Sequence, residues 1–239
     1  MLHPFLIPNL ARVDKSLPTA AIDLSGAYSD PAPAGTGYAQ SQWQLIPSMA
    51  KDLTQSQAAK RFVDYVDAAK DAGAPSVNLI LEAPLSYCFE GRRTGSTSLN
   101  ARLRAVERGK HYPQLRESNV PDRPWTVNAG ASTALVAILL LRHLNISLPA
   151  GLQVNLFEGF WSWSEKPNAH HKVARALIEG FSANAADEPA HIVPLPDGAD
   201  EFHYQTILDV VFPTANPTSS PPLIVYGDPV LAGLYSPSH

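Results

Sequence analysis

The segment Val77-Asn-Leu-Ile-Leu-Glu82-Ala-Pro84 is a short apolar run that ends on one acidic residue and is then stopped by a proline. An apolar run of about four to eight residues between breakers is typical of a β-strand buried on both faces. In open α/β sheets, ligands bind in the crevice beyond the carboxyl ends of such strands. The run therefore predicts an α/β fold and makes Glu82 a candidate functional residue.

Two further segments repeat this pattern. Thr19-Ala-Ala-Ile-Asp23-Leu-Ser-Gly26 and Leu152-Gln-Val-Asn-Leu-Phe-Glu158-Gly159 are strand-like runs that each deliver an acid near their end. We expect the carboxylates of Asp23 and Glu82 to lie a few ångströms apart at adjacent strand ends. A single acid in such a place is more often a cap or an ion-pair partner. For Glu158 the candidate ion-pair partners are Lys166, Lys172 and Arg175.

The remaining periodic segments alternate between helix and strand. Residues 53–72 carry an apolar stripe at helical spacing, with Thr54 as a candidate N-cap and Gly73 as the stop. Further helices are predicted over residues 129–144, 170–181 and 199–212, and further strands over residues 38–46, 223–226 and 231–235. This alternation predicts a mixed sheet of five or more strands flanked by helices.

We expect the strand that contains Val77 to be central in this sheet, with the strand that contains Thr19 beside it. Residues 1–18 are expected to form an irregular N-terminal arm, and residues 19–239 a single α/β domain.

The stretch of residues 85–127 is a long insert with no clear periodicity, apart from a short helix predicted over residues 98–108. Loops this long in compact domains are often functional. The insert is rich in arginine, and a guanidinium group can bind a phosphate through two parallel hydrogen bonds. The candidate nucleic-acid contacts are Arg92, Arg93, Arg102 and Arg104. The alternative is a solvated, salt-bridged face, since acidic residues share the insert.

Charge and cysteine content limit the partners and the compartment. The net charge of −4 over 239 residues argues against a broad electrostatic grip on nucleic acid or membrane, so nucleic acid would be held by a local patch. The single cysteine, Cys88, is typical of a reducing, cytoplasmic setting. The first residues lack a basic region and are broken by prolines, so no signal peptide is expected. The longest apolar run, residues 134–141, is too short to span a bilayer.

Carboxylates gathered at one sheet edge repel one another unless a cation lies between them. Mg²⁺ and Mn²⁺ prefer such oxygen ligands, and a pair of these ions can clamp both reacting oxygens of a phosphodiester. We therefore predict that Asp23 and Glu82 bind a divalent cation and that Asp200, in the first turn of the last predicted helix, completes the site, with Glu158 as a candidate fourth ligand. His203 and Asp209 on the same helix are alternatives. Capping alone would also favour an acid at position 200.

Several of these motifs resemble a known group of proteins. Ile22-Asp23-Leu-Ser-Gly26 is similar to the opening of RNase H-like folds, and Glu82-Ala-Pro84 is similar to the acid that follows a central strand in them. More narrowly, over about residues 19–236 the chain resembles the RNase H-like family of predicted nucleases catalogued as domain of unknown function four hundred and twenty-nine. The resemblance extends to the Arg92-Arg93 segment, the strand ending at Glu158, Lys172 and Arg175 on the following helix, and Gly227-Asp228-Pro229.

The resemblance implies a metal-dependent nuclease that cleaves phosphodiester bonds of DNA or RNA with Mg²⁺ or Mn²⁺. It implies catalytic roles for Asp23, Glu82, Glu158 and Lys172. The chain departs from the family at Glu82, where the family commonly has aspartate. It also lacks the Asp-Ala-Leu signature of the last helix, which leaves the ligand from that helix open among Asp200, His203 and Asp209.

Two other functions fit parts of the sequence. An inactive RNase H-like scaffold would bind a protein or nucleic-acid partner through the arginine-rich insert, with tryptophans as anchors, because Trp and Arg dominate interface hot spots. Those tryptophans are Trp125, Trp161 and Trp163. A nucleophilic enzyme would use Cys88 with His111 or His203 as base, although a lone cysteine is usually a small buried hydrophobe. The adjacent His170 and His171 point in different directions on a helix, so we expect an exposed pair rather than a shared metal site.

Overall fold

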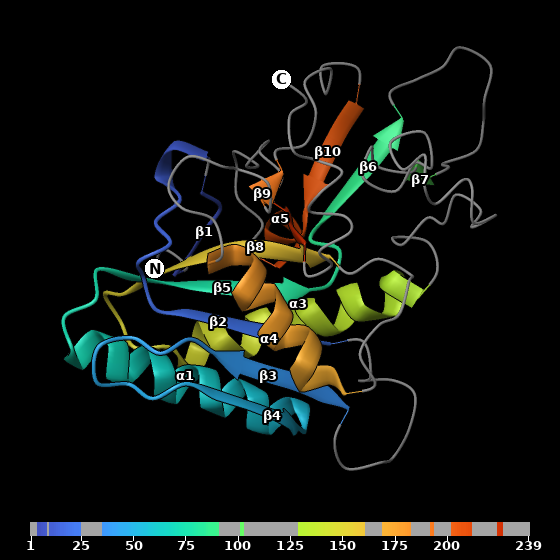
Figure 1. The fold of residues 1–239 in the computed structure, drawn as a ribbon. Coiled ribbons are helices and arrows are strands. Elements are labelled where there is room, and N and C mark those ends of the chain that lie inside the picture. The colour runs from blue at the N-terminus through green and yellow to red at the C-terminus, as the bar shows by residue number, and fades with distance from the viewer. Residues whose placement is uncertain are drawn as a thin grey trace, which may run out of the picture.

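The computed structural model describes residues 4–8, 10–24, 35–90, 101–102, 129–160, 169–182, 192–193, 202–211 and 224–226. Within them the chain forms a mixed α/β sheet with six main strands (Figure 1). These are β2 (Thr19–Asp23), β3 (Thr36–Gln40), β4 (Met49–Leu53), β5 (Ser76–Glu82), β8 (Gln153–Phe160) and β11 (Ile224–Tyr226).

The strands lie in the order β4-β3-β2-β5-β8-β11. β2, β3 and β4 form an antiparallel meander, whereas β2, β5, β8 and β11 run parallel to one another. The strand that contains Val77 therefore lies inside the sheet, with the strand that contains Thr19 beside it, as predicted. Two-residue segments extend the sheet: β1 (Phe5–Leu6) pairs with β8, and β9 (Ile192–Val193) pairs with β11.

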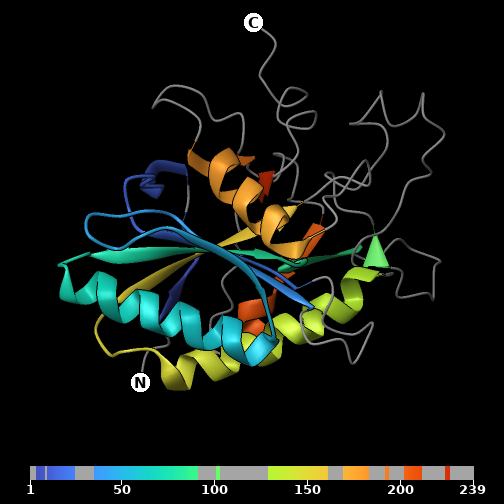
Figure 2. The ribbon, with the colours of Figure 1, turned by 60° about the horizontal axis from the view of Figure 1, so that its bottom comes forward.

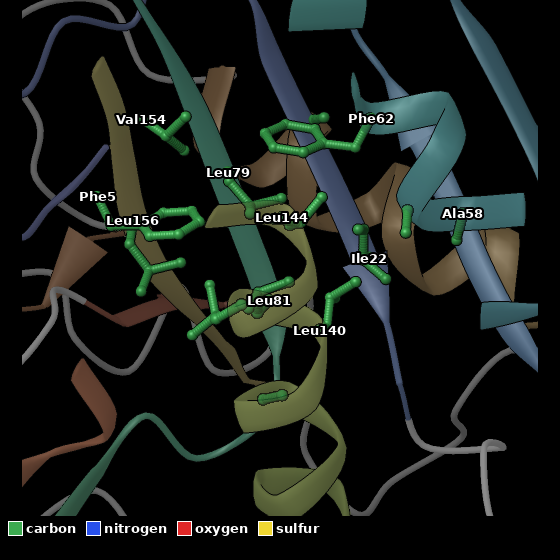
Figure 3. Packing of buried hydrophobic residues seen from close by; sticks show 14 of the residues in the cluster. Phe5, Ile22, Ala58, Phe62, Leu79, Leu81, Leu140, Leu144, Val154 and Leu156 are labelled. Carbon is green, nitrogen blue, oxygen red and sulfur yellow. The ribbon is translucent and has the colours of Figure 1, made fainter. Parts of the chain in front are cut away.

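Helices cover both faces of the sheet (Figure 2). α1 (Gln55–Asp71) and α3 (Ala129–Ser147) lie on one face, and α4 (His170–Ser182) lies on the other. Ile22, Leu81 and Leu156 of the sheet pack with Phe62 and Leu140 of the helices in the larger apolar core (Figure 3). A smaller core on the opposite face joins the alternate strand residues, among them Ala21, Ile80 and Phe157, to α4.

Local sequence signals set the ends of α1, much as predicted. The Thr54 hydroxyl accepts a hydrogen bond from the Gln57 backbone N–H, and the Gln57 side chain accepts one from the Thr54 N–H, which forms a capping box. The helix stops before Gly73, whose φ of 81° is a conformation that glycine adopts without steric cost.

Buried asparagines attach the N-terminal arm to the sheet. The Asn78 amide donates to the Asp14 carbonyl at 2.9 Å and to the Thr19 hydroxyl at 3.2 Å, and the Asn155 amide donates to the Asn78 side-chain oxygen at 3.0 Å. Because buried polar groups are costly unless paired, this network holds the backbone of the arm to the sheet at Asp14. The arm is therefore more ordered than expected, since it also contributes β1 and the short 3-10 helix of Leu10–Arg12.

A second, three-stranded sheet has the order β10-β6-β7. It contains β6 (Ser86–Glu90), β7 (Ala101–Arg102) and β10 (Phe202–Thr206), and the short helix α5 (Ile207–Val211) follows β10. The prediction of a helix over residues 199–212 is therefore wrong for residues 202–206, which form β10. These residues pair with β6, more than a hundred residues earlier in the chain, and this long-range pairing outweighs local helical spacing.

Other predicted boundaries also change. The strand predicted over residues 38–46 is β3 followed by a tight turn, and β4 was not predicted. Residues 101–102 are a strand rather than part of the short helix expected there. The rest of the arginine-rich insert after residue 90 and the strand predicted over residues 231–235 lie outside the described residues. Among the described helices, none is long and apolar enough to cross a membrane.

Candidate functional site

Asp23 and Glu82 are the last residues of the neighbouring parallel strands β2 and β5, and they lie directly opposite each other in the register. Residues in register point to the same face of a sheet, so both carboxylates lie on the face that α4 covers, beyond Ala21 and Ile80. Asp23 is 0% exposed and Glu82 is 4% exposed. The predicted pairing of these two acids at adjacent strand ends is confirmed.

Glu158 lies near the same edge of the sheet but points to the other face. Its register partner is Leu81, not Glu82, and Leu81 belongs to the core under α1 and α3. Glu158 is also fully buried, and its Oε2 atom accepts a hydrogen bond from the backbone N–H of Leu85 at 2.8 Å. The three acids of the sequence pattern are therefore divided between the two faces.

Two consecutive histidines at the start of α4 contact two different acids of the sheet. His170 Nδ1 lies 3.0 Å from Asp23 Oδ2. The backbone N–H of His171 donates to Asp52 Oδ1 at 2.7 Å, and the Nδ1 atom of its ring lies 3.1 Å from the same oxygen. Asp52 thus serves as a distant cap for the N-terminus of α4. The histidines diverge as predicted, but each is only about one third exposed.

Gly37 makes the close approach of α4 to the sheet possible. In the register across β4, β3 and β2 it lies between Asp52 and Asp23. A Cβ atom at Gly37 would lie 2.1 Å from the backbone carbon of His170 and 2.6 Å from the backbone nitrogen of His171. Only a residue without a side chain fits here, so the first turn of α4 rests directly on β3.

These contacts identify residues that the sequence left out. His170 had no predicted role, because nothing in the sequence relates it to Asp23, which lies 147 residues earlier. Asp52 was missed because β4 was not predicted. The sequence signal was a pair of histidines at the start of a helix that follows a strand with an acid near its end. This pattern is too common to identify the partner of either histidine.

The other predicted site residues are not brought together in the part of the chain that the structure describes. Lys172 is exposed on α4, and His203 lies in β10 opposite Phe89. Arg102 lies in β7 opposite Cys88, and Asp209 lies in α5. The candidates outside the described residues are Asp200, Arg92, Arg93, Arg104, His111, Trp125, Trp161 and Trp163.

The described residues contain no group of three or more His, Cys, Asp or Glu side chains arranged to hold a metal ion. Asp23 and Glu82 are a pair of adjacent carboxylates of the kind that hard divalent cations prefer. They fit two positions of such a site, and further ligands would have to come from other parts of the chain.

Comparison with known proteins gave no match to any family model, curated protein or solved structure.

Proposed function

We propose that this chain is a metal-dependent phosphodiesterase that acts on DNA or RNA. The observation that supports this proposal best is the in-register pair of Asp23 and Glu82 at the carboxyl ends of two central parallel strands. In a mixed α/β sheet this edge is where ligands bind. The position of the pair agrees with the RNase H-like resemblance of the sequence, on which the choice of a phosphodiester substrate rests.

The electrostatics of the pair favour a cation as its ligand. Two carboxylates on the same face of neighbouring strands repel each other, and burial strengthens the repulsion because few water molecules screen it. A Mg²⁺ or Mn²⁺ ion held by Asp23 and Glu82 would relieve that repulsion. When bound, such an ion makes its water ligand easier to deprotonate and stabilises negative charge on a phosphate.

In this proposal the protein residues have separate roles. Asp23 and Glu82 hold the cation, and Asp200 is the proposed further ligand. His170 fixes the orientation of Asp23, since a carboxylate can accept a hydrogen bond through one oxygen and bind a metal through the other. Lys172 is exposed two residues further along α4 and is available to contact a phosphate group.

Substrate binding is assigned to the arginine-rich insert. Its four candidate arginines would bind the phosphates of the nucleic acid, because the net charge of −4 leaves the rest of the chain a poor polyanion receptor. β6 is the first element of the insert, and it follows β5 after only three residues. The insert therefore begins close in sequence to Glu82.

An inactive scaffold is the alternative, and one observation favours it. His170 contacts Asp23 and His171 contacts Asp52, so both acids already fasten α4 to the sheet. In that case the carboxylates would serve the fold, and the insert and tryptophans would bind a protein or nucleic-acid partner.

Calorimetric titration with Mn²⁺ separates the two functions. We expect the wild-type protein to bind Mn²⁺, and Asp23→Asn or Glu82→Gln to abolish binding without unfolding the protein. Asp52→Asn is the matched control, because Asp52 also faces a histidine of α4 but is not next to Glu82. It should bind Mn²⁺ like the wild type.

Activity is then tested on labelled single-stranded and duplex DNA and RNA with Mg²⁺ or Mn²⁺, with Asp23→Asn beside the wild type. Absence of Mn²⁺ binding by the wild type at millimolar concentration would defeat the proposal and leave the scaffold in its place.

A further inference from the structure

We infer that Glu158 is a positioning residue that fixes the turn after Glu82, and that it is not itself a ligand of the cation. What Glu82 does in this inference rests on the proposed function, whereas the position of the turn does not. The inference starts from one contact: the Oε2 atom of Glu158 accepts the backbone N–H of Leu85 at 2.8 Å. Both residues are 0% exposed.

The sheet register directs Glu158 away from the acid pair. Leu81 is its partner on β5, so the Glu158 side chain lies on the face of Leu79, Leu81, Val154 and Leu156. Figure 3 shows these four residues in the larger core. Asp23 and Glu82 lie on the other face, under α4. A carboxylate on the α1 and α3 face is poorly placed to share an ion with them, but it is well placed to reach the backbone where β5 ends.

Within the described residues, the turn after Glu82 makes few other backbone hydrogen bonds. Ala83 N–H bonds to the Leu81 carbonyl at 2.9 Å, and Pro84 has no N–H to donate. The Leu85 N–H binds Glu158, and the Leu85 carbonyl accepts from the Ile207 N–H at 2.8 Å. Glu158 therefore links β8 of the main sheet to the point where β5 passes into β6 and meets α5.

This link gives Glu158 an indirect influence on the acid pair. If the Leu85 N–H loses its acceptor, the buried turn must move to find another partner, because an unpaired buried donor is costly. Glu82 lies only three residues before Leu85, so such movement changes the direction of its carboxylate. Loss of a group that orients a metal ligand typically weakens metal binding by about 10- to 100-fold.

Three substitutions of Glu158 test the inference beside Glu82→Gln. Glu158→Gln keeps an oxygen acceptor and removes the charge, Glu158→Asp keeps the charge and retracts it by one methylene, and Glu158→Ala removes both. The measurements are the exchange rate of the Leu85 amide hydrogen in metal-free protein, followed by NMR, and the dissociation constant of Mn²⁺, followed by calorimetry.

We expect Glu158→Ala and Glu158→Asp to speed Leu85 exchange by about tenfold or more and to weaken Mn²⁺ binding by a similar factor. Glu158→Gln should stay within about threefold of the wild type in both measurements, because the glutamine oxygen accepts the same N–H. Glu82→Gln should abolish Mn²⁺ binding and leave Leu85 exchange unchanged.

The inference is overturned if Glu158→Gln loses Mn²⁺ binding as completely as Glu82→Gln, since Glu158 would then be a ligand. It is also overturned if Leu85 exchange is unchanged in Glu158→Asp, the variant that remains informative when Glu158→Ala does not fold. If the wild type binds no Mn²⁺, the proposed function fails, and the exchange rates alone decide whether Glu158 fixes the turn.

Discussion

Asp23 and Asp52 each contact one of two consecutive histidines at similar distances, but they differ in burial. Asp23 is fully buried, whereas the Asp52 side chain is 28% exposed. We expect His170→Ala to lower the free energy of unfolding by about 2 kcal/mol, because a buried carboxylate loses a hydrogen-bond donor.

His171→Ala should lower the free energy of unfolding by less than about 1 kcal/mol, because solvent screens the Asp52 carboxylate. Asp52 also still accepts the hydrogen bond from the backbone N–H of residue 171. Urea denaturation measures both variants. Equal losses would mean that burial does not set the strength of these contacts.

Gly37 gives a second prediction at the scale of single residues. An alanine at Gly37 meets the backbone of His170 at 2.1 Å, so the first turn of α4 must move away from β3. We expect Gly37→Ala to cost about 3 kcal/mol or more in the free energy of unfolding.

Gly159→Ala is the comparison, because its closest contact, at 2.8 Å, is with the end of the Leu177 side chain, and its nearest backbone atom, Glu82 Cα, lies farther away at 3.3 Å. Gly159→Ala should lower the free energy of unfolding clearly less than Gly37→Ala does. A similar loss in both variants, measured by chemical denaturation, would contradict a backbone contact at Gly37.

At the scale of the element, α1 depends on a reciprocal cap. Thr54→Ala removes the hydroxyl that accepts the Gln57 N–H, and we expect a loss of about 1 kcal/mol in the free energy of unfolding. Thr54→Ser keeps the hydroxyl and should retain most of the stability. A fall as large in Thr54→Ser as in Thr54→Ala would show that the threonine methyl group, not the cap, stabilises the helix.

The helix α4 depends on tertiary contacts more than α1 does. Its first turn is held by Asp52, by Asp23 and by the close approach to Gly37, all of which come from the sheet. Its inner face, with Val173, Leu177 and Phe181, packs on the smaller core. Anything that disturbs the edge of β2, β3 and β4 will therefore disturb α4 before it disturbs α1.

At the scale of the whole molecule, two tyrosines make the folded protein less stable at alkaline pH. Burial raises the pKa of Tyr38 well above its ordinary value. The charges of Tyr65 and Asp64 raise this pKa further, whereas the charge of Arg61 lowers it. Burial also raises the pKa of Tyr65. The folded protein therefore keeps protons that the unfolded chain releases near pH 10, so stability is fully present below about pH 10 and falls as the pH rises above it.

We expect Tyr38→Phe to reduce the loss of stability at alkaline pH. The measurement is the fall in melting temperature between about pH 8 and about pH 10.5. Tyr65→Phe is the comparison, because the pKa of Tyr65 is raised less far than that of Tyr38. At the lower pH the variant is expected to be slightly less stable than the wild type, since the Tyr38 hydroxyl donates to Gln40 at 2.8 Å. An unchanged difference in melting temperature between the two pH values would contradict the prediction.

Much of the central sheet follows from the sequence because its signals are local. Buried strands need continuous apolar runs, so the segments that end at Asp23, Glu82 and Glu158 are recognisable one by one. The start and end of α1 follow from Thr54 and Gly73 for the same reason. The sequence also predicts that the strands of Asp23 and Glu82 are neighbours, and in the observed register these two terminal acids lie opposite each other.

Tertiary structure alone decided the rest, because register and packing depend on residues far apart in the chain. Pairing Glu158 with Leu81 rather than Glu82 turns its side chain to the opposite face, since a shift of one residue reverses every side chain of a strand. Docking of α4 brings His170 to Asp23 across 147 residues. Pairing with β6 makes residues 202–206 a strand. No local pattern predicts the register, the docking or the strand, because each of them depends on a partner segment elsewhere in the chain.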